Sequence, residues 1–475
     1  GLEERARRAR AIHQSFHWDL EFPEPLFGAR GFDLVVSNPP FGNAIEAQTR
    51  RGAGLGRLAK ELFPVFARGA YDLSVLFWAR ACSSLLGVDG RYAWLSPSAL
   101  LSSTQPWQAW MHEHWRPTHL TLYPVDAFSV ARVRTCGYVG RRGAARSLLV
   151  CDRDVSGEPG SHERDWEQPW RPWYAITRGA LHLAEGGSGL LRLEQVAELS
   201  AGCATGVAYQ LRPHVLDASR AEGPRLVTTG AIDRYRCRWG ERRIRYLGGD
   251  YSHPRWPVGD GPELVGGLRR ARDRQACPKV LVGGLTAVLE AWHDREGNSA
   301  GVVSTWVLTS RVARGDPAEL GLLTAMLNSA TFCRRYMALH GASAMSGKQT
   351  TIKKRALAAM EVPEELARPR VALDREAALR WVREQNAALS GSQLAALLAA
   401  VSGWLGESED DPGWSGLDAL AHRVAAGLYG LKAPEAFDDY GWWCARSGTQ
   451  PVAGELPGWL ERTRIACELV TRLPN

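Results

Sequence analysis

The sequence lacks the features that mark secreted, metal-binding and membrane proteins. Its 475 residues include nine cysteines, and no two of them form a CxxC pair. The spacings of zinc sites and disulfide scaffolds are therefore missing. The twelve histidines show no metal-ligand spacing either. No apolar run reaches the length of a membrane span, and no signal peptide opens the chain. We therefore expect reduced thiols, no metal, no membrane partner and a cytoplasmic location.

What the sequence does contain is an ordinary globular composition with a basic excess. Apolar residues make up 45% of the chain, charged residues 23%, and the formal net charge is +7. The length allows two or three domains. The positive excess fits a polyanionic partner without requiring one. The chain opens at Gly1 within a charged, helix-like run, so we expect that the start of a longer protein is missing.

Apolar strand patterns alternate with helical spacing in the first third of the chain. The expected strands cover residues 32–37, 91–95 and 119–123, and the expected helices cover residues 72–86 and 105–115. This alternation predicts an α/β fold with a mainly parallel, doubly wound sheet. Two β-rich runs within residues 133–150 predict a hairpin at the end of that sheet.

Changes in composition divide the chain into four parts. Residues 1–151 form the expected α/β domain, and the polar residues 152–189 form a linker. Residues 190–366 contain short strand patterns with many glycines and arginines, which predicts an α+β domain. Residues 367–475 are rich in alanine and leucine and predict a helical C-terminal region.

The motif Asn38-Pro39-Pro40-Phe41 follows directly after the first expected strand. Doubly wound sheets bind ligands at this edge. A loop with two hydrogen-bond acceptors would suit an exocyclic amine such as that of adenine. This amine is a poor nucleophile, and acceptors for both of its hydrogens would free its lone pair. The Asn38 side chain and the Pro39 carbonyl offer such acceptors. Two prolines stiffen the loop, and Phe41 provides a flat face for a base. An ordinary Asn-Pro turn is the alternative, but the apolar strand and the aromatic residue favour catalysis.

The segments around this motif resemble the Eco57I/TaqI-type DNA adenine-N6 methyltransferases. That family includes large type IIG restriction–modification enzymes and PglX-like methylases of phage defence. The similar segments are residues 16–24, 31–43, 71–77, 90–98, 196–206, 322–329, 362–363 and 417–431. The resemblance implies a partial class I S-adenosylmethionine-dependent methyltransferase sheet, followed by a target-recognition (DNA specificity) domain over residues 190–366.

The resemblance also implies S-adenosylmethionine as cofactor and double-stranded DNA as partner, with further restriction or defence subunits allowed. It assigns catalysis on a flipped adenine to Asn38, Pro39, Pro40 and Phe41. Asp33 is the candidate for the cofactor edge, and a buried acid satisfied by backbone donors is the alternative. The family places an aromatic residue against the flipped base, and Tyr138 is the nearest candidate.

One family feature is missing, namely the aromatic-x-Gly-x-Gly cofactor loop that should precede the catalytic motif. Residues 1–30 do not contain it. We therefore expect that most of the cofactor pocket lies outside this chain and that the fragment alone is inactive.

Basic residues in the second half are candidates for contact with DNA. Arg234, Arg236 and Arg238 alternate in a run mixed with aromatic residues, which predicts a strand with one basic face. Lys348, together with Lys353 and Lys354, follows the segment 322–329 and is expected to contact phosphates. A solvated basic surface is the alternative for both sets.

Two other functions stay open. Protein-glutamine N5 methyltransferases use a similar Asn-Pro-Pro-aromatic loop, but here more than three hundred residues follow residue 151. That long extension favours DNA recognition. A chain without its cofactor loop could also be a DNA-binding or specificity remnant that performs no catalysis.

Overall fold

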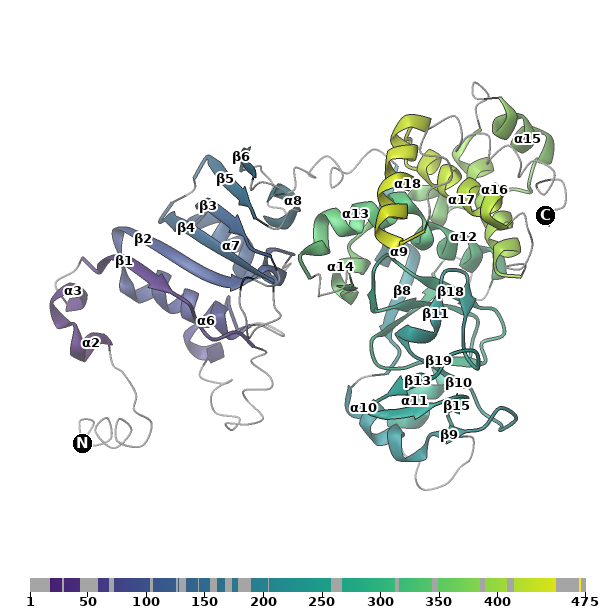
Figure 1. Cartoon of the computed structure of the whole chain (residues 1–475), viewed down its shortest axis with the longest axis horizontal. Coiled ribbons are helices and arrows are strands. Elements are labelled where there is room, and N and C mark those ends of the chain that lie inside the picture. The colour runs from purple at the N-terminus through teal and green to yellow at the C-terminus, as the bar shows by residue number, and fades with distance from the viewer. Residues whose placement is uncertain are drawn as a thin grey trace. The chain divides into compact units, whose positions relative to one another are not determined.

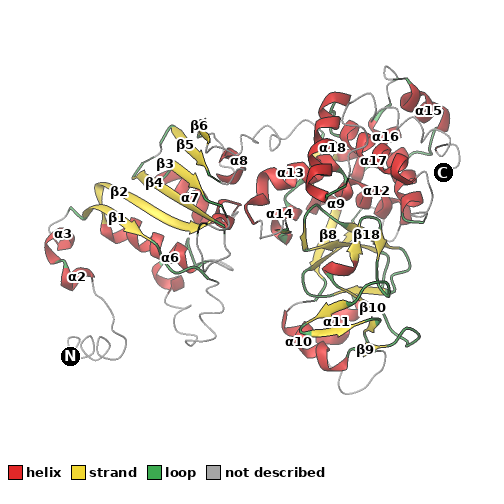
Figure 2. Ribbon diagram, in the orientation of Figure 1, coloured by secondary structure: helices red, strands yellow, loops and turns green. Residues whose placement is uncertain are grey.

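The computed structural model describes most of the chain. The described residues are 18–27, 30–42, 59–67, 72–102, 106–124, 127, 134–143, 145–153, 160–166, 173–177, 189–203, 205–257, 267–311, 316–343, 349–384, 389–407, 414–449 and 470. They belong to two compact units, Gly1–Leu181 and His182–Asn475 (Figures 1 and 2). We call these unit 1 and unit 2.

Unit 1 is built on a six-stranded sheet with the order β1-β2-β4-β3-β5-β6. The strands are β1 (Phe32–Ser37), β2 (Leu86–Pro97), β3 (Pro117–Leu122), β4 (Thr135–Arg141), β5 (Ser147–Asp152) and β6 (Gly160–Asp165). The pairs β1–β2 and β3–β5 are parallel, and the other neighbours are antiparallel. The α/β class is confirmed, but the sheet is mixed rather than mainly parallel.

Two details of the predicted organisation are wrong. The β-rich runs at the end of the sheet do not form a hairpin, because β3 lies between β4 and β5. The predicted linker is partly structured, since β6 pairs with β5 and a short helix, α8 (Trp173–Thr177), follows it. Unit 1 therefore continues beyond residue 151.

Helices cover one face of this sheet through a cluster of large aromatic rings. These helices are α6 (Leu73–Arg80), which continues as a π-helical turn (Ala81–Leu85), α7 (Pro106–His114) and α8. Two short helices, α2 (Trp18–Glu21) and α3 (Pro23–Phe27), precede β1, and Trp18 of α2 lies against Phe32. The aromatic cluster consists of Trp78, Tyr92, Trp94, Trp107, Tyr138 and Trp173, all buried. Trp78 lies at its centre, with ring centroids 5.0 to 6.1 Å from the other five. Their burial anchors the helices to the sheet.

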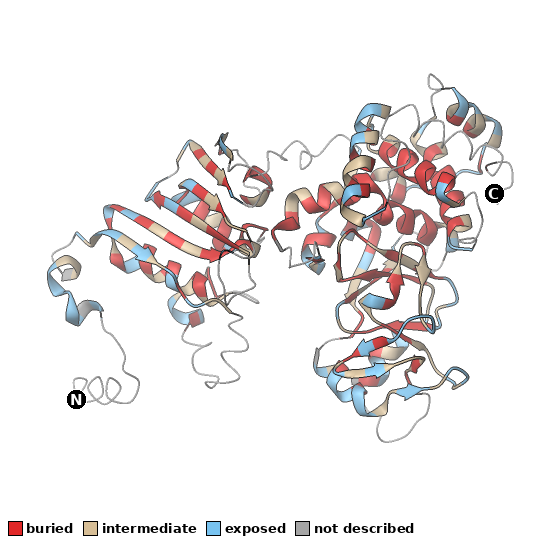
Figure 3. Cartoon of the chain, in the orientation of Figure 1, coloured by how far each residue is buried: buried red, intermediate tan, exposed pale blue. Residues whose placement is uncertain are grey.

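The opposite face of the sheet is largely exposed. Side chains two residues apart along a strand share a face, so Leu34 and Val36 lie together, and the strand register adds Val139. These side chains are 57%, 70% and 44% exposed. Figure 3 shows the resulting alternation of buried and exposed bands along β2 and β4.

Unit 2 combines an antiparallel sheet with a group of helices. The sheet has the order β18-β16-β20-β8, formed by β8 (Ala197–Ala201), β16 (Lys279–Gly283), β18 (Ala291–Asp294) and β20 (Thr305–Ser310). The helices are α9 (Leu193–Val196), α12 (Pro317–Asn328), α13 (Ala330–His340), α14 (Lys354–Ala358), α15 (Arg375–Arg383), α16 (Gly391–Leu405), α17 (Trp414–Leu428) and α18 (Ala433–Ser447). One hydrophobic core includes both groups. The predicted α+β domain and helical region thus pack as one body.

A smaller lobe of unit 2 has its own sheet, β19-β10-β15-β9, and its own core around Trp256. The lobe contains α10 (Thr205–Leu211), β9 (Leu216–Asp217), β10 (Arg225–Val227), β15 (Pro254–Arg255), α11 (Gly267–Asp273) and β19 (Ser299–Gly301). The remaining pairs are β7 (Leu190–Arg192) with β22 (Glu361–Pro363), β11 (Ile232–Asp233) with β12 (Arg236–Cys237), β13 (Ile244–Tyr246) with β14 (Gly249–Tyr251), and β17 (Leu285–Thr286) with β21 (Thr350–Thr351).

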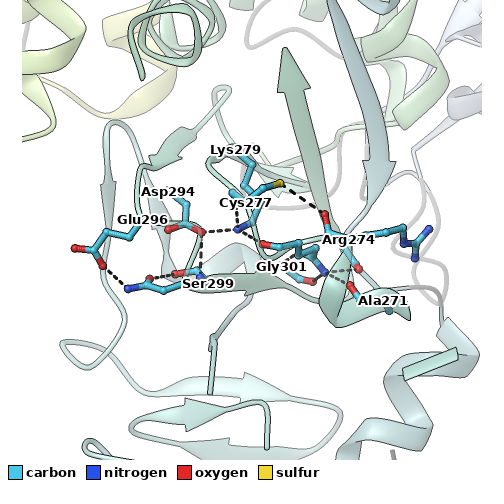
Figure 4. Close-up of polar contacts among 11 residues, drawn as sticks. Ala271, Arg274, Cys277, Lys279, Asp294, Glu296, Ser299 and Gly301 are labelled. Carbon is cyan, nitrogen blue, oxygen red and sulfur yellow. Dashed lines mark hydrogen bonds and ion pairs between the residues drawn. The ribbon is translucent and has the colours of Figure 1, made fainter. Parts of the chain in front are cut away.

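A buried polar network joins the lobe to the larger sheet (Figure 4). Lys279 is fully buried, and its ammonium group pairs with Asp294 and donates to the carbonyl of Gln275 at 2.7 Å. The Gln275 amide in turn bonds the carbonyl of Gly202 and the backbone N–H of Gly301, both at 2.8 Å. Each buried charge is thus paired and hydrogen-bonded, as burial requires.

In the parts of the chain that the structure describes, no helix combines the length and apolar character needed to cross a membrane.

Candidate functional site

The motif Asn38–Phe41 leaves the sheet at the carboxyl end of β1. Because β1 and β2 run parallel, with Ser37 opposite Trp94, both strands direct their carboxyl ends to this edge. Asn38 and Pro40 are exposed, Pro39 is buried and Phe41 is half-buried. The loop is therefore fixed through Pro39 and presents the carboxamide of Asn38 to solvent. This is the exposure that a group binding a substrate amine needs.

A single aspartate connects this loop to the helix that follows it. One carboxylate oxygen of Asp72 accepts a hydrogen bond from the backbone N–H of Gly42 at 3.0 Å. The other caps α6 by accepting from the N–H of Ser74 at 2.9 Å. The carbonyl of Gly42 also accepts from the N–H of Leu73 at 2.9 Å. Gly42 has φ of +150°, which favours glycine at this point. Asp72 thus fixes the end of the loop that contains Asn38–Phe41.

Sequence reasoning missed this role of Asp72. The signal was present, because an aspartate directly before a helix is a typical N-cap. What the sequence could not give is the second bond, which reaches back thirty residues to Gly42.

Asp33, the candidate for the cofactor edge, is exposed on β1. The alternative of a buried acid is therefore wrong. Within the described residues, no hydrogen bond reaches its carboxylate. Asp33 is accessible to a ligand, and its role toward a cofactor stays a prediction.

Tyr138 does not have the environment predicted for it. It lies in the middle of β4, only 1% exposed, with its ring 5.0 Å from that of Trp78. Its hydroxyl oxygen accepts hydrogen bonds from Ser96 and Cys136, each at 3.1 Å. Burial raises the pKa of Tyr138 well above its ordinary value. A ring packed in the core offers no face to a flipped base, so the base-stacking role assigned to Tyr138 is not supported.

Arg234 is likewise an internal residue rather than a DNA-facing one. Its guanidinium donates to both carboxylate oxygens of Asp418 on α17 and lies 4.3 Å above the ring of Trp443. Burial alone would raise the pKa of Asp418, but Arg234 and His422 outweigh it and hold that pKa well below its usual value. Arg234 therefore joins the turn between β11 and β12 to α17. This internal role corrects its predicted contact with DNA.

The basic strand predicted over residues 234–238 is a tight hairpin instead. β11 and β12 are joined at Arg234 and Tyr235, and Tyr235 has φ of +63°. Arg236 donates to Glu241 at 2.7 Å, and Arg238 donates to Asp233 at 2.8 Å. Both arginines are partly exposed, but their charge is already balanced by neighbouring acids.

Two arginines a few residues later are more available to a partner than Arg236 and Arg238. Arg243 and Arg245 are exposed, and neither forms an ion pair with a residue that the structure describes. Arg245 points outward from β13, because its neighbours Ile244 and Tyr246 are buried. This alternation around Arg245 was readable in the sequence. The acids that neutralise Arg236 and Arg238 also lie nearby in the chain, but their pairing depends on the turn.

The three lysines that were predicted to contact phosphates differ in their exposure and in whether the structure describes them. Lys348 lies outside the described residues. Lys353 is half-buried, its backbone N–H donates to the hydroxyl of Tyr336 at 2.9 Å, and burial lowers its pKa. Lys354 is exposed at the start of α14. Of the set, Lys354 is the described side chain best exposed for a phosphate.

Asn328, in the segment similar to the family's recognition helix, has a structural role. Its side chain accepts from the backbone N–H of Ala291 at 2.8 Å and donates to the carbonyl of the same residue at 2.9 Å. It therefore bonds α12 to β18 as a neighbouring strand would.

No group of three or more histidine, cysteine, aspartate or glutamate side chains that could hold a metal ion occurs among the described residues.

Comparison with known protein families finds a match for the first part of the chain. Residues 3–128 match the family model described as the Eco57I restriction-modification methylase. The predicted resemblance to this family is confirmed for that segment, which contains Asn38–Phe41. No curated protein matches the chain.

Three solved structures that align with the chain are of restriction or restriction–modification enzymes. The type IIL restriction-modification enzyme MmeI in complex with DNA is 10% identical, with a TM-score of 0.45 over 93% of this chain and 57% of its own. The type IIG restriction endonuclease BpuSI is 13% identical, with a TM-score of 0.29 over 86% and 55%. A nuclease-deletion mutant of the type ISP enzyme LlaGI in complex with a DNA substrate mimic is 9% identical, with a TM-score of 0.39 over 84% and 44%. The chain spans about half the length of these proteins.

Proposed function

We propose that this chain provides the catalytic loop and the DNA-recognition region of a site-specific DNA methyltransferase in a restriction–modification or phage-defence system. The proposed reaction transfers a methyl group from S-adenosylmethionine to N6 of adenine. The observation that carries the proposal is the exposed Asn38 on a proline-stiffened loop at the carboxyl end of β1, within the segment that matches the methylase family.

The loop's part in the reaction follows from its acceptors. The adenine amine is delocalised into the ring, and its nitrogen becomes nucleophilic when both hydrogens are held out of conjugation. The carboxamide oxygen of Asn38 holds one hydrogen, and the carbonyl of Pro39 holds the other. Phe41 stacks on the base after the nucleotide is flipped from the duplex. Asp72 keeps the loop in place through Gly42.

S-adenosylmethionine would supply a sulfonium-bound methyl group and an excellent leaving group. The described residues fit only part of its pocket, namely the exposed edge of β1 with Asp33 and Asn38. Asp33 is our candidate for accepting a hydrogen bond from the cofactor, because its carboxylate is accessible. The remainder of the pocket must come from residues that the structure does not describe or from outside this chain.

Recognition of DNA is assigned to unit 2. The exposed Arg243 and Arg245 have charges that no described acid neutralises, so they can meet phosphates or guanine edges without breaking an ion pair. Lys354 provides a further phosphate contact, and Lys348 stays a candidate. Arg236 and Arg238 would first have to leave their acids, which lowers their contribution.

The test is methylation in a host without adenine methylation. The gene, together with any coding sequence upstream of Gly1, is expressed there, and N6-methyladenine is mapped along the genome by single-molecule sequencing. We expect methylation at one recognition motif. Asn38→Ala should lower it by roughly a hundredfold or more, because one of two preorganised acceptors is lost.

Asn38→Asp is the matched variant, since it keeps an acceptor oxygen of nearly the same size. It should retain more methylation than Asn38→Ala. Asn38 is exposed, so neither substitution should lower the melting temperature. Soluble protein that methylates no adenine would contradict the proposal and favour a DNA-binding remnant. Loss of methylation with retained sequence-specific binding in Asn38→Ala would separate catalysis from recognition.

A further inference from the structure

Unit 1 contains a cavity at the edge of the sheet opposite to Asn38. Its volume is about 700 Å³, within the range of pockets for small ligands. The cavity lies where β4 ends at Arg141 and β5 begins at Ser147. β4 runs antiparallel to β2, and the carboxyl ends of β1 and β2 lie at the other edge. The catalytic motif therefore does not use this space.

Arginines dominate the wall of the cavity. Arg116 is buried, and its guanidinium is fixed by hydrogen bonds to the carbonyls of His112 at 2.7 Å and Ala145 at 3.3 Å. Arg142 lies 5.9 Å from the ring centroid of Trp115. Arg141 and Arg146 are exposed and form no ion pair with any residue that the structure describes. The wall thus gathers positive charge that the described fold does not neutralise.

Two carboxylates complete the lining. Asp89 lies at the start of β2 and Glu163 on β6, and both are exposed at the cavity. Neither forms an ion pair with a described residue. With four arginines against two acids, the net charge of the lining is +2 when His119 is neutral.

This mixture selects a particular chemistry. Guanidinium groups bind phosphate oxygens through paired N–H donors. Carboxylates are acceptors only, so they repel phosphates but bind hydroxyl groups. An extended nucleic-acid backbone would bring phosphates against Asp89 or Glu163 as well. A compact phosphate ester that carries free hydroxyl groups satisfies both kinds of side chain.

We propose that this arginine-lined cavity binds a free phosphate ester of nucleotide size, with phosphates on Arg141 and Arg146 and sugar hydroxyls on Asp89 or Glu163. The site is separate from the proposed methyl transfer and does not depend on it. It would make the chain responsive to a soluble nucleotide at the end of unit 1 remote from the catalytic loop.

The test is isothermal titration of the full chain with ADP, inorganic pyrophosphate and a short single-stranded DNA. We expect ADP to bind, and the double variant Arg141→Ala/Arg146→Ala to weaken it roughly tenfold or more. The matched control is Arg91→Ala/Arg153→Ala, which removes the same charge from exposed positions outside the lining and should leave ADP binding unchanged. Glu163→Gln should weaken ADP but not pyrophosphate.

Four results would overturn the proposal. No heat of binding at millimolar ADP would mean that the arginines are only solvated. Equal losses in both double variants would indicate diffuse attraction to a basic surface. DNA binding that Arg141→Ala/Arg146→Ala weakens as much as it weakens ADP binding would assign the cavity to a nucleic-acid backbone. Equal affinity for ADP and pyrophosphate would remove the role of the hydroxyl groups. Unchanged melting temperatures of the variants establish that folding is not the cause.

Discussion

The two units stabilise their interiors in different ways. In unit 1, helices and sheet meet through the aromatic cluster around Trp78, where packing and apolar burial provide the stability. In unit 2, charged side chains lie inside, as in the pairs Lys279–Asp294 and Arg234–Asp418. Apolar burial is nonspecific in direction, whereas a buried ion pair requires one partner in one geometry. The stability of unit 1 should therefore depend on the volume of its buried side chains, and the stability of unit 2 on buried charge and on pH.

The largest effect should come from emptying the aromatic cluster. Trp78→Ala removes a ring that contacts five other rings, so unit 1 should lose about 4–5 kcal/mol of unfolding free energy, near the upper end for such substitutions. Hydrogen exchange measured on peptides from β2 and β4 reports it. Peptides from unit 2 should keep their protection if the units are independent.

Phe77→Ala is the control for that variant, because Phe77 is adjacent on α6 but 47% exposed. It should cost less than about 1 kcal/mol. If both variants weakened β2 equally, the cluster would not be the centre of unit 1, and the contrast between the units would fail.

Removal of one buried charge should be the next largest effect. Lys279→Met leaves the carboxylate of Asp294 buried without its cation, and we expect a loss of about 3 kcal/mol in unit 2. The loss should lie at the low end of the usual range, because the N–H of Ser299 still donates to Asp294. Denaturant unfolding followed by exchange of β16 and β18 measures it.

The double variant Lys279→Met/Asp294→Asn sharpens this test. Asparagine keeps an acceptor for Ser299 but carries no charge, so it should recover part of the lost stability. A double variant as unstable as Lys279→Met would assign the loss to packing and not to charge.

The pH dependence of unit 2 should expose its buried ionisable groups. Burial, with Asp233 adding to it, raises the pKa of Glu290 to about 8. A carboxyl with a raised pKa stays protonated in the folded state after the unfolded chain has lost its proton. The stabilisation that Glu290 gives to the folded state is therefore complete below about pH 4, and it is lost progressively as pH rises toward 8. Glu290→Gln should therefore add about 1–2 kcal/mol at pH 8, a discounted fraction of the full linkage.

His293 works in the opposite direction. Burial lowers its pKa to about 4, so the folded state holds it neutral and loses stability as pH falls from about 6.5 toward 4. The Glu290→Gln variant lacks the opposing contribution of Glu290, so its free energy of unfolding should rise as pH increases from about 4 to 6.5. A wild type and variant with the same pH profile would contradict the role of Glu290.

The sequence predicted the local features of unit 1 well. The expected strand at 32–37 coincides with β1, the strand at 91–95 falls in β2, and the strand at 119–123 overlaps β3 and extends one residue beyond its end. Apolar runs bounded by turns carry this information within a few residues of one another. The order of the strands does not follow from them, because the insertion of β4 beside β2 depends on pairing over long separations.

The roles of single side chains were harder to predict wherever the partner is remote. Tyr138 has the residue type of a base-stacking group, but α6 and α8 cover it with Trp78 and Trp173. Arg234 has the pattern of a DNA contact, but Asp418 lies 184 residues further along the chain. The prediction for Asn38 rests on a local signal, namely a strand, two prolines and an aromatic residue, and the structure places Asn38 exposed at the end of β1.

The smallest expected change in stability tests a polar contact in the unit that is otherwise held by aromatic packing. Asp72→Asn keeps one carbonyl oxygen to cap α6 at Ser74, but its amide nitrogen cannot accept from the N–H of Gly42. We expect a cost of about 0.5–1 kcal/mol in unit 1, as for other capping contacts. If the loop matters as proposed, methylation in the genomic assay should fall far more than so small a cost would explain, while binding to DNA is kept. A variant that methylates normally would show that Pro39 alone fixes the loop, and unit 1 would then depend on packing even at its catalytic edge.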